Sequence, residues 1–335
     1  SIFAHLQAQQ ASGQDLEATE LPDEAHFRED SGLGFVPGIM DNIFSETDRD
    51  AKEVVTAVRR VLKNPGKANI GRLYQLLKEE SVVGLVDDAL SLITQDPPDP
   101  DRFCIFFDWL ARRSPDREPV KFAIAMLGIL TGNEYTEMFL TFGAHEEFTK
   151  FAGVALSNSL PPEEAYQALV KLVRSVHGWG RIDLVHRLAP DGDDDFRRWL
   201  VREGFQNKIM DEYLAYTAAT EGRLLEQLAG DGAGTDDALM DGAAGIFVAL
   251  DEGSPAEDMS DYEEGATAVF RWFALVGNRP GTLLRALAAQ TLRSLASDPE
   301  GPWASEVSEK IANLAQRYLD RSEITELVLQ ALTAG

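Results

Sequence analysis

Three segments decide the fold: GAHEEFTKFAGVAL (residues 143–156), HGWGRIDLVHRLA (177–189) and DFRRWLVREGFQNKIMDEYLAYTAATEG (195–222). Each places apolar residues three or four positions apart, which is the spacing of one face of an α-helix. Isolated helices of fewer than about 12–15 residues are marginal in water. The sequence therefore predicts helices that are stable only because they lie against their neighbours.

The same period continues on both sides of this stretch. Asp99 followed by Pro100 predicts an N-cap and a first-turn proline for one of these helices. No run of six or more residues alternates apolar and polar side chains convincingly, so no strand is predicted. Outside the three segments, the clearest predicted helices cover residues 68–79, 81–94, 101–112, 119–130 and 162–176.

Roughly sixteen short amphipathic helices joined by short loops predict an all-α protein. The pattern has no long crossover connection and no long bundle helix. It therefore favours a right-handed α-α superhelix, a HEAT- or armadillo-like solenoid, over a four-helix bundle. The antiparallel helix pairs differ in length and share no fixed signature, so the predicted repeats are degenerate. Residues 45–335 are predicted to form this single solenoid domain.

Residues 1–44 differ from the rest of the chain. After a short helix near the start, this segment is polar and acidic, and residues such as Gly13, Pro22 and Pro37 interrupt regular structure. We predict an extended arm whose apolar second half packs on the helices. Two further roles stay open for the arm, which could join two copies of the chain or cover the groove of the solenoid.

The chain is strongly acidic, with 31 Lys and Arg against 56 Asp and Glu and a formal net charge of −25. Nucleic-acid binding depends on cationic side chains that displace counterions from phosphates, and the basic residues here are scattered. We therefore expect no nucleic acid and no membrane surface as a partner, whereas the charge favours a basic protein or peptide.

Composition also bears on the compartment. The longest apolar run, residues 122–130, is shorter than the about 20 residues that cross a bilayer, and no secretory signal is visible. Cys104 is the single cysteine, which excludes an intrachain disulfide and a thiolate cluster for zinc. One cysteine fits a reducing compartment, and we expect a cytoplasmic protein.

Three stretches resemble an uncharacterised bacterial family of HEAT-like helical proteins. They are HEEFT (residues 145–149), HGWGRI (177–182) and WLVREGFQNKIMDEYLAY (199–216), within about the central half of the chain. The resemblance implies a HEAT-like superhelix. Some members of that family are labelled limonene hydroxylase, which implies a monooxygenase. The residues themselves show neither a glycine-rich strand-turn-helix for flavin or nicotinamide nor a haem-type cysteine, so no cofactor is predicted.

Trp179 and Arg181 are the first candidates for recognition. Gly178 and Gly180 flank the tryptophan and leave room for the indole to be presented, and Trp and Arg are enriched at binding hot spots. The alternative is a tryptophan packed where two helices turn, with Arg181 paired with a nearby carboxylate. Four other tryptophans lie on helical stripes and are expected in the core or in a groove, with the core as the default: Trp109, Trp199, Trp272 and Trp303.

His145, Glu146 and Glu147 form a second candidate at the start of a helix. They could bind a ligand, or the carboxylates could simply be favoured by the helix dipole. Asp183 and His186 share a helix face and could supply two metal ligands, but this spacing alone is too weak to predict a metal. No Gly-x-Ser-x-Gly elbow places a nucleophile, and no catalytic residue is predicted.

Two functional hypotheses follow from these patterns. The preferred one is a non-enzymatic scaffold whose concave face binds a protein or peptide. The other is an enzyme, or a protein that binds a small ligand or metal, with its site in the groove. That site would need one pocket on which six side chains converge: His145, Glu146, Glu147, Trp179, Arg181 and His186.

Overall fold

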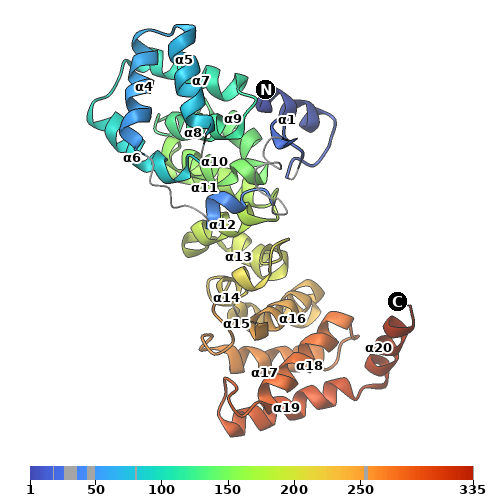
Figure 1. Ribbon diagram of the computed structural model, residues 1–335. Helices are drawn as coiled ribbons and strands as arrows, with labels where there is room; N and C mark the ends of the chain where they lie inside the picture. The colour runs from blue at the N-terminus through green and yellow to red at the C-terminus, as the bar shows by residue number, and fades with distance from the viewer. Residues whose placement is uncertain (18, 26–35, 44–49, 80, 253–255, 335) are drawn as a thin grey trace. The chain divides into compact units, whose positions relative to one another are not determined.

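The computed structural model describes residues 1–17, 19–25, 36–43, 50–79, 81–252 and 256–334, and within these ranges the chain is helical, without a strand. Figure 1 shows the helices in chain order. The predicted all-α class is therefore confirmed. None of the helices in these ranges has the length and apolar character that crossing a membrane requires.

The helices up to residue 188 are α1 (Ile2–Ala11), α3 (Ile39–Ile43), α4 (Ala51–Lys63), α5 (Lys67–Lys78), α6 (Val83–Gln95), α7 (Pro100–Arg113), α8 (Arg117–Leu127), α9 (Thr136–Gly143), α10 (Glu146–Ser159), α11 (Pro162–Val173) and α12 (Trp179–Leu188). After them come η1 (Ala189–Asp191), α13 (Asp194–Trp199), η2 (Leu200–Gly204), α14 (Glu212–Thr220), α15 (Leu224–Ala229), η3 (Ala233–Thr235), α16 (Asp237–Glu252), α17 (Gly265–Val276), α18 (Leu283–Ser297), α19 (Ser305–Leu319) and α20 (Ser322–Ala334).

Local signals predict the helix boundaries well. α7 begins at Pro100, and the Asp99 carboxylate accepts a hydrogen bond from the Arg102 N–H at 3.0 Å, which confirms the predicted N-cap. The helices predicted over residues 68–79, 81–94 and 162–176 correspond to α5, α6 and α11. Their ends agree because capping residues and prolines act within one turn.

The chain divides into two compact units, Ser1–Leu184 and Val185–Gly335, and the boundary lies inside α12. The sequence predicts one solenoid domain over residues 45–335. That single domain, its right-handed path and its repeat character stay predictions. Each unit is described by itself below.

In the first unit, helices pack on their sequence neighbours and on the next helix but one. α7 packs on α8, α9 on α10 and α10 on α11, while α8 also contacts α10 and α4 contacts α6. α8 lies deepest, because α5, α6, α7 and α10 surround it. Its Arg117, Glu118 and Lys121 are buried together with its apolar residues.

The second unit has the same kind of packing around its own core. α18 packs on α16 and α19, and α17 packs on α19. Trp272 of α17 is fully buried, and its indole N–H donates to the Met240 carbonyl at 2.9 Å. The buried Arg285 guanidinium pairs with Asp237 at 3.0 Å and Asp241 at 2.6 Å, which attaches α18 to α16.

The segment predicted to be an arm contributes α1 and α3 to the first unit. Ile2, Phe3 and Leu6 are buried where α1 packs on α7 and α9. Lys150 of α10 donates to the Asp41 carbonyl at 2.6 Å and so holds α3. Residues 26–35 of the predicted arm lie outside the described ranges.

Candidate functional site

Glu146 caps the beginning of α12. One carboxylate oxygen accepts hydrogen bonds from the His177 and Gly178 N–H groups at 2.9 and 2.6 Å, and the other accepts from Gly180 at 2.5 Å. N–H groups at the start of a helix have no partner within the helix. They also form the positive end of the dipole of α12, which favours a carboxylate. Burial raises the pKa of Glu146, while the N–H bonds from Gly178 and Gly180 oppose that shift. Glu146 therefore has a structural role in starting α12.

His145 is the buried N-cap of α10. Its Nδ1 accepts a hydrogen bond from the Glu147 N–H at 3.1 Å, and its Nε2 lies 2.8 Å from the Thr19 carbonyl oxygen. A carbonyl can only accept, so Nε2 carries the proton and the ring is neutral. Burial lowers the pKa of His145, which favours this neutral form. The imidazole thus joins the segment that follows α1 to α10.

Glu147 belongs to a buried charge cluster. At its centre, Lys121 Nζ lies 2.6 Å from the Asp41 carboxylate, 2.9 Å from Glu118 and 2.7 Å from Glu147. The cluster joins α8 and α10 to three residues that come before α4 in the sequence, Asp23, Glu24 and Asp41. Its seven members are Asp23, Glu24, Asp41, Arg117, Glu118, Lys121 and Glu147.

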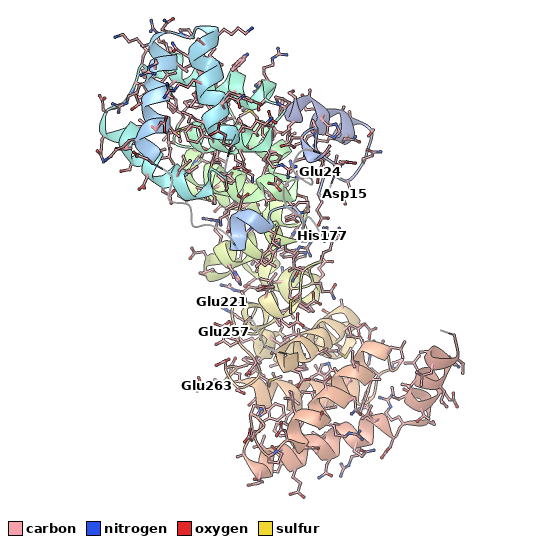
Figure 2. The ribbon with its side chains drawn as sticks, viewed as in Figure 1. Asp15, Glu24, His177, Glu221, Glu257 and Glu263 are labelled. Atoms are coloured by element: carbon pink, nitrogen blue, oxygen red, sulfur yellow. The ribbon has the colours of Figure 1, made fainter. Side chains whose placement is uncertain are left out.

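Arg117 is the second cation of the buried charge cluster and is 1% exposed. Its guanidinium donates twice to Asp23 at 3.1 Å and once to Glu24 at 2.9 Å, and it lies 3.4 Å from Glu147. Figure 2 labels Glu24 and also His177, and both residues lie in the first unit. The arm carboxylates therefore meet the α8 cations where water is excluded.

Among the described members of the buried charge cluster, five carboxylates surround two cations. Burial alone lowers the pKa of Lys121, but Asp41, Glu118 and Glu147 raise it well above its ordinary value. Burial raises the pKa of Glu147, but Lys121 and Arg117 bring it below its ordinary value. For Asp41, burial prevails over Lys121 and raises the pKa to about 6. The proton that the cluster takes up first is therefore on Asp41.

Trp179 and Arg181 are also buried, at 7% and 5% exposure. Gly38 has φ +80° and lies against the tryptophan, because a Cβ at Gly38 would be 3.5 Å from Trp179 Cβ and 2.9 Å from the Glu146 carbonyl oxygen. Arg181 Nε donates to the Val176 carbonyl at 2.7 Å. The predicted alternative, a packed tryptophan at a helix turn, agrees with these contacts.

His186 is exposed, and its Nε2 lies 3.2 Å from the Tyr213 carbonyl oxygen within the second unit. The other five candidates lie in the packing between the arm, α10 and α12. None of the six lines any of four cavities found among the described residues. Their contacts explain all six without a ligand, and a binding role for them stays a prediction. Among the described residues, no group of three or more His, Cys, Asp or Glu could hold a metal ion.

A different surface of the first unit presents an open apolar cavity, which we call the Trp109 groove. It has a volume of about 510 Å³ and lies between the end of α4, the turn that follows, α5 and α7. Its lining residues are Val61, Leu62, Lys63, Pro65, Ile70, Arg102, Ile105, Phe106 and Trp109.

Ile105 is 72% exposed and Trp109 is 43% exposed, so Trp109 takes the groove position that the sequence left open and not the default core position. The two residues are four positions apart and share one face of α7. The opposite face buries Phe103, Phe107 and Leu110. α7 therefore carries apolar residues on two faces, one packed in the core and the other open at the groove.

The charged residues that line the Trp109 groove are both cations. Arg102 donates to the Leu62 carbonyl at 3.3 Å and keeps its remaining N–H groups at the surface. Lys63 is exposed and forms no ion pair with any residue that the structure describes. The groove thus combines an apolar floor with positive charge in a chain of net charge −25.

Comparison of the chain with protein-family models, with curated proteins and with solved structures gives no match. We therefore infer the function from the geometry of the Trp109 groove.

Proposed function

We propose that the protein is a non-enzymatic binding protein that holds a peptide segment of another protein in the Trp109 groove. The observation that carries this proposal is the pair Ile105 and Trp109, largely exposed and four residues apart beside a cavity of about 510 Å³. Contiguous exposed apolar surface marks interaction sites in soluble proteins, and tryptophan is enriched at their hot spots. Covering each of these side chains is worth about 1.5–3 kcal/mol, enough to anchor a short segment.

The groove favours a segment that carries both apolar side chains and carboxylates. Whole-chain charge favours a basic partner, but charges beyond about 8 Å are screened at physiological salt. Lys63 and Arg102 are the charges within that distance of an occupant, because they line the groove themselves. We therefore expect Asp or Glu of the segment beside these two cations, with aliphatic or aromatic residues over Ile105 and Trp109.

The proposal includes the HEAT-like right-handed superhelix as the scaffold and the cytoplasm as the compartment. Several helices in each unit pack on a sequence neighbour or on the next helix but one, as α7 does on α8 and α16 on α18, which supports stacked helix pairs. The single cysteine supports a reducing compartment.

The enzymatic alternative receives no support from its six candidate residues. Both carboxylate oxygens of Glu146 accept hydrogen bonds from backbone N–H groups. Both carboxylate oxygens of Glu147 are also occupied, by the Lys121 ammonium group, the Arg117 guanidinium and the Gly38 N–H. Buried groups held in this way explain stability and leave no free atom for a substrate.

Selection of peptides from a displayed library of random short sequences tests the proposal on the full chain. We expect enriched peptides that combine Trp, Phe, Leu or Ile with Asp or Glu. Trp109→Ala and Ile105→Ser each weaken their binding about tenfold or more, because each removes apolar surface at the centre of the interface. Titration of one synthetic selected peptide, followed by fluorescence anisotropy, gives the dissociation constants.

Leu287→Ser is the matched control, because Leu287 is also a largely exposed apolar residue, at 51%, on α18. This variant leaves peptide binding unchanged. Selected peptides that bind Trp109→Ala as tightly as the natural chain, or that lose affinity equally with Leu287→Ser, contradict the proposal.

A further inference from the structure

A second cavity lies wholly within the second unit and has a volume of about 850 Å³, within the range of small-molecule sites. Four arginines line it: Arg197, Arg198, Arg202 and Arg223. Five carboxylates line it as well, so its wall carries both signs of charge: Asp194, Glu226, Asp231, Asp236 and Asp237. We call this cavity the arginine pocket.

Arg202 builds the wall of the arginine pocket. Its Nε and Nη2 donate to the Asp236 carboxylate at 3.2 and 2.6 Å, and its Nη1 donates to Gln227 Oε1 at 2.6 Å. Asp236 also accepts the Leu239 N–H at the start of α16. Arg202 therefore ties η2 to α15 and α16, and its donors are used.

The guanidinium groups of Arg197, Arg198 and Arg223 keep N–H groups that can still donate hydrogen bonds. Arg198 and Arg223 form no hydrogen bond from their guanidinium groups to any described residue, and their nearest carboxylates, Asp195 and Glu226, lie 3.7 Å away. Arg197 donates through Nε to the Glu221 carbonyl at 3.2 Å, which leaves its terminal N–H groups 3.9 Å or more from Asp194. Exposed pairs at such distances contribute little, so these groups are available to an anion.

The backbone around the arginine pocket is unusual at two points. Arg223 has φ +53° and, in the described ranges, is the one non-glycine residue with positive φ. Such strain persists only where surrounding structure enforces it. The neighbouring position 222 also requires glycine, because a Cβ there would lie 2.2 Å from the Ala218 carbonyl oxygen. The element that carries Arg202, η2, is a π-helical turn, a form that recurs at functional sites.

We propose that the arginine pocket binds a small molecule that carries one phosphate group together with hydroxyl groups. Guanidinium groups donate two parallel hydrogen bonds to phosphate oxygens, and Arg197, Arg198 and Arg223 provide three such groups. Two of the five lining carboxylates are paired with arginines, Asp236 with Arg202 and Asp237 with Arg279 and Arg285. The other three, Asp194, Glu226 and Asp231, accept hydrogen bonds from hydroxyl groups and disfavour a ligand with many negative charges. A sugar monophosphate meets both requirements. This site is independent of the Trp109 groove, which lies in the other unit.

Calorimetric titration at constant ionic strength tests the proposal with three probes: glucose 6-phosphate, glucose and inorganic phosphate. We expect saturable binding of glucose 6-phosphate, weaker binding of inorganic phosphate and none of glucose. The double variant Arg198→Ala/Arg223→Ala binds glucose 6-phosphate at least about tenfold more weakly, because it loses two charge-assisted contacts. Arg317→Ala, which removes an exposed arginine of α19, binds as the natural chain does.

Arg223→Gly separates lost binding from lost folding. Glycine adopts positive φ without strain, so this variant melts at the same or a higher temperature while its affinity for glucose 6-phosphate falls. The proposal is overturned if neither phosphate probe binds saturably, or if the double variant and Arg317→Ala bind alike. Inorganic phosphate that binds as tightly as glucose 6-phosphate overturns the assignment of hydroxyl groups to the ligand.

Discussion

Lys121 shows how much a single residue matters in the first unit. Its ammonium group is buried among three carboxylates, one each from α3, α8 and α10. Desolvation of a buried charge is offset only when partners and hydrogen bonds are complete. Such a group therefore adds little net stability, but removing the cation is costly, because its carboxylates stay buried without a counterion.

We predict that Lys121→Met destabilises the first unit by about 3–5 kcal/mol, because Asp41, Glu118 and Glu147 would be left as uncompensated buried charges. Urea unfolding followed by circular dichroism measures the loss. Lys310→Met is the control, since Lys310 pairs with Glu306 on the surface and is 61% exposed. A loss below about 1 kcal/mol for Lys121→Met would mean that the carboxylates are already neutral.

Asp41 and Glu147 should respond to pH with opposite signs. The pKa of Asp41 is raised to about 6, above its ordinary 3.8. The folded state thus keeps a proton that the unfolded state has lost, and stability falls as pH rises from about 4 to about 6. Asp41→Asn removes this penalty and is more stable than the natural chain near about pH 8, by up to about 3 kcal/mol, with the gain vanishing near about pH 4.

Glu147 has a lowered pKa, so its contribution to stability is present above its ordinary pKa of 4.5 and is lost as pH falls through its folded-state value. We expect Glu147→Gln to destabilise the protein near about pH 8 by about 2–4 kcal/mol, and the difference to shrink in acid. Unfolding curves at a series of pH values measure both variants. Parallel pH profiles for Asp41→Asn and Glu147→Gln would contradict the assignment of the first proton to Asp41.

At the scale of the element, the packing of α12 on α10 depends on a glycine. A Cβ added to Gly180 would lie 2.6 Å from Thr149 Cβ and Oγ1, so the two helices would have to separate. We predict that Gly180→Ala costs about 1–3 kcal/mol, because overpacking shifts side chains and backbone. Gly71→Ala in α5 meets nothing within 4 Å and should stabilise by about 0.5–1 kcal/mol.

Thermal melting of the two glycine variants provides the comparison. Gly180→Ala melts below the natural chain and Gly71→Ala above it. If both variants shift the melting temperature in the same direction, helix propensity alone governs them, and the close approach of α12 and α10 is not tight.

Helix positions were predictable because they depend on local chemistry. The Asp99 cap, Pro100 and the three- and four-residue apolar spacing act within one or two turns, and α7 begins where they indicate. The buried charge cluster was not predictable in this way. Its pairs join residues 94 positions apart, as in Asp23 with Arg117, or 80 apart, as in Asp41 with Lys121. Periodicity gives the apolar face of a helix but not the neighbour that will cover it.

For the candidate site residues, too, local sequence predicts the position in a helix but not the partners. Glu146 and Glu147 were correctly placed at a helix start, yet their partners on α12 and α8 follow only from the fold. Trp109 lies on an apolar stripe, and no local pattern shows that a neighbouring helix leaves it uncovered. The sequence therefore indicated which residues were unusual but not what they contact.

At the scale of the whole molecule, the net charge of −25 opposes compaction. Like charges repel over about 30 Å at 0.01 M salt but only about 10 Å at 0.1 M. We predict that NaCl added across this range raises the melting temperature by a few degrees, because repulsion among surface carboxylates outweighs the loss of exposed ion pairs. A melting temperature that falls with salt would show that the ion pairs dominate.

The same charge separates an acidic from a basic occupant of the Trp109 groove. At about 0.01 M salt an acidic peptide is repelled by the whole chain, whereas near 0.1 M it senses mainly Lys63 and Arg102. We therefore expect its association rate to rise with salt at first and to fall at higher salt, when the local attraction is screened as well. A basic peptide would lose rate steadily from the lowest salt. Stopped-flow anisotropy with a selected peptide measures this, and a steady decline for an acidic peptide would show that local cations control association even where screening is weakest.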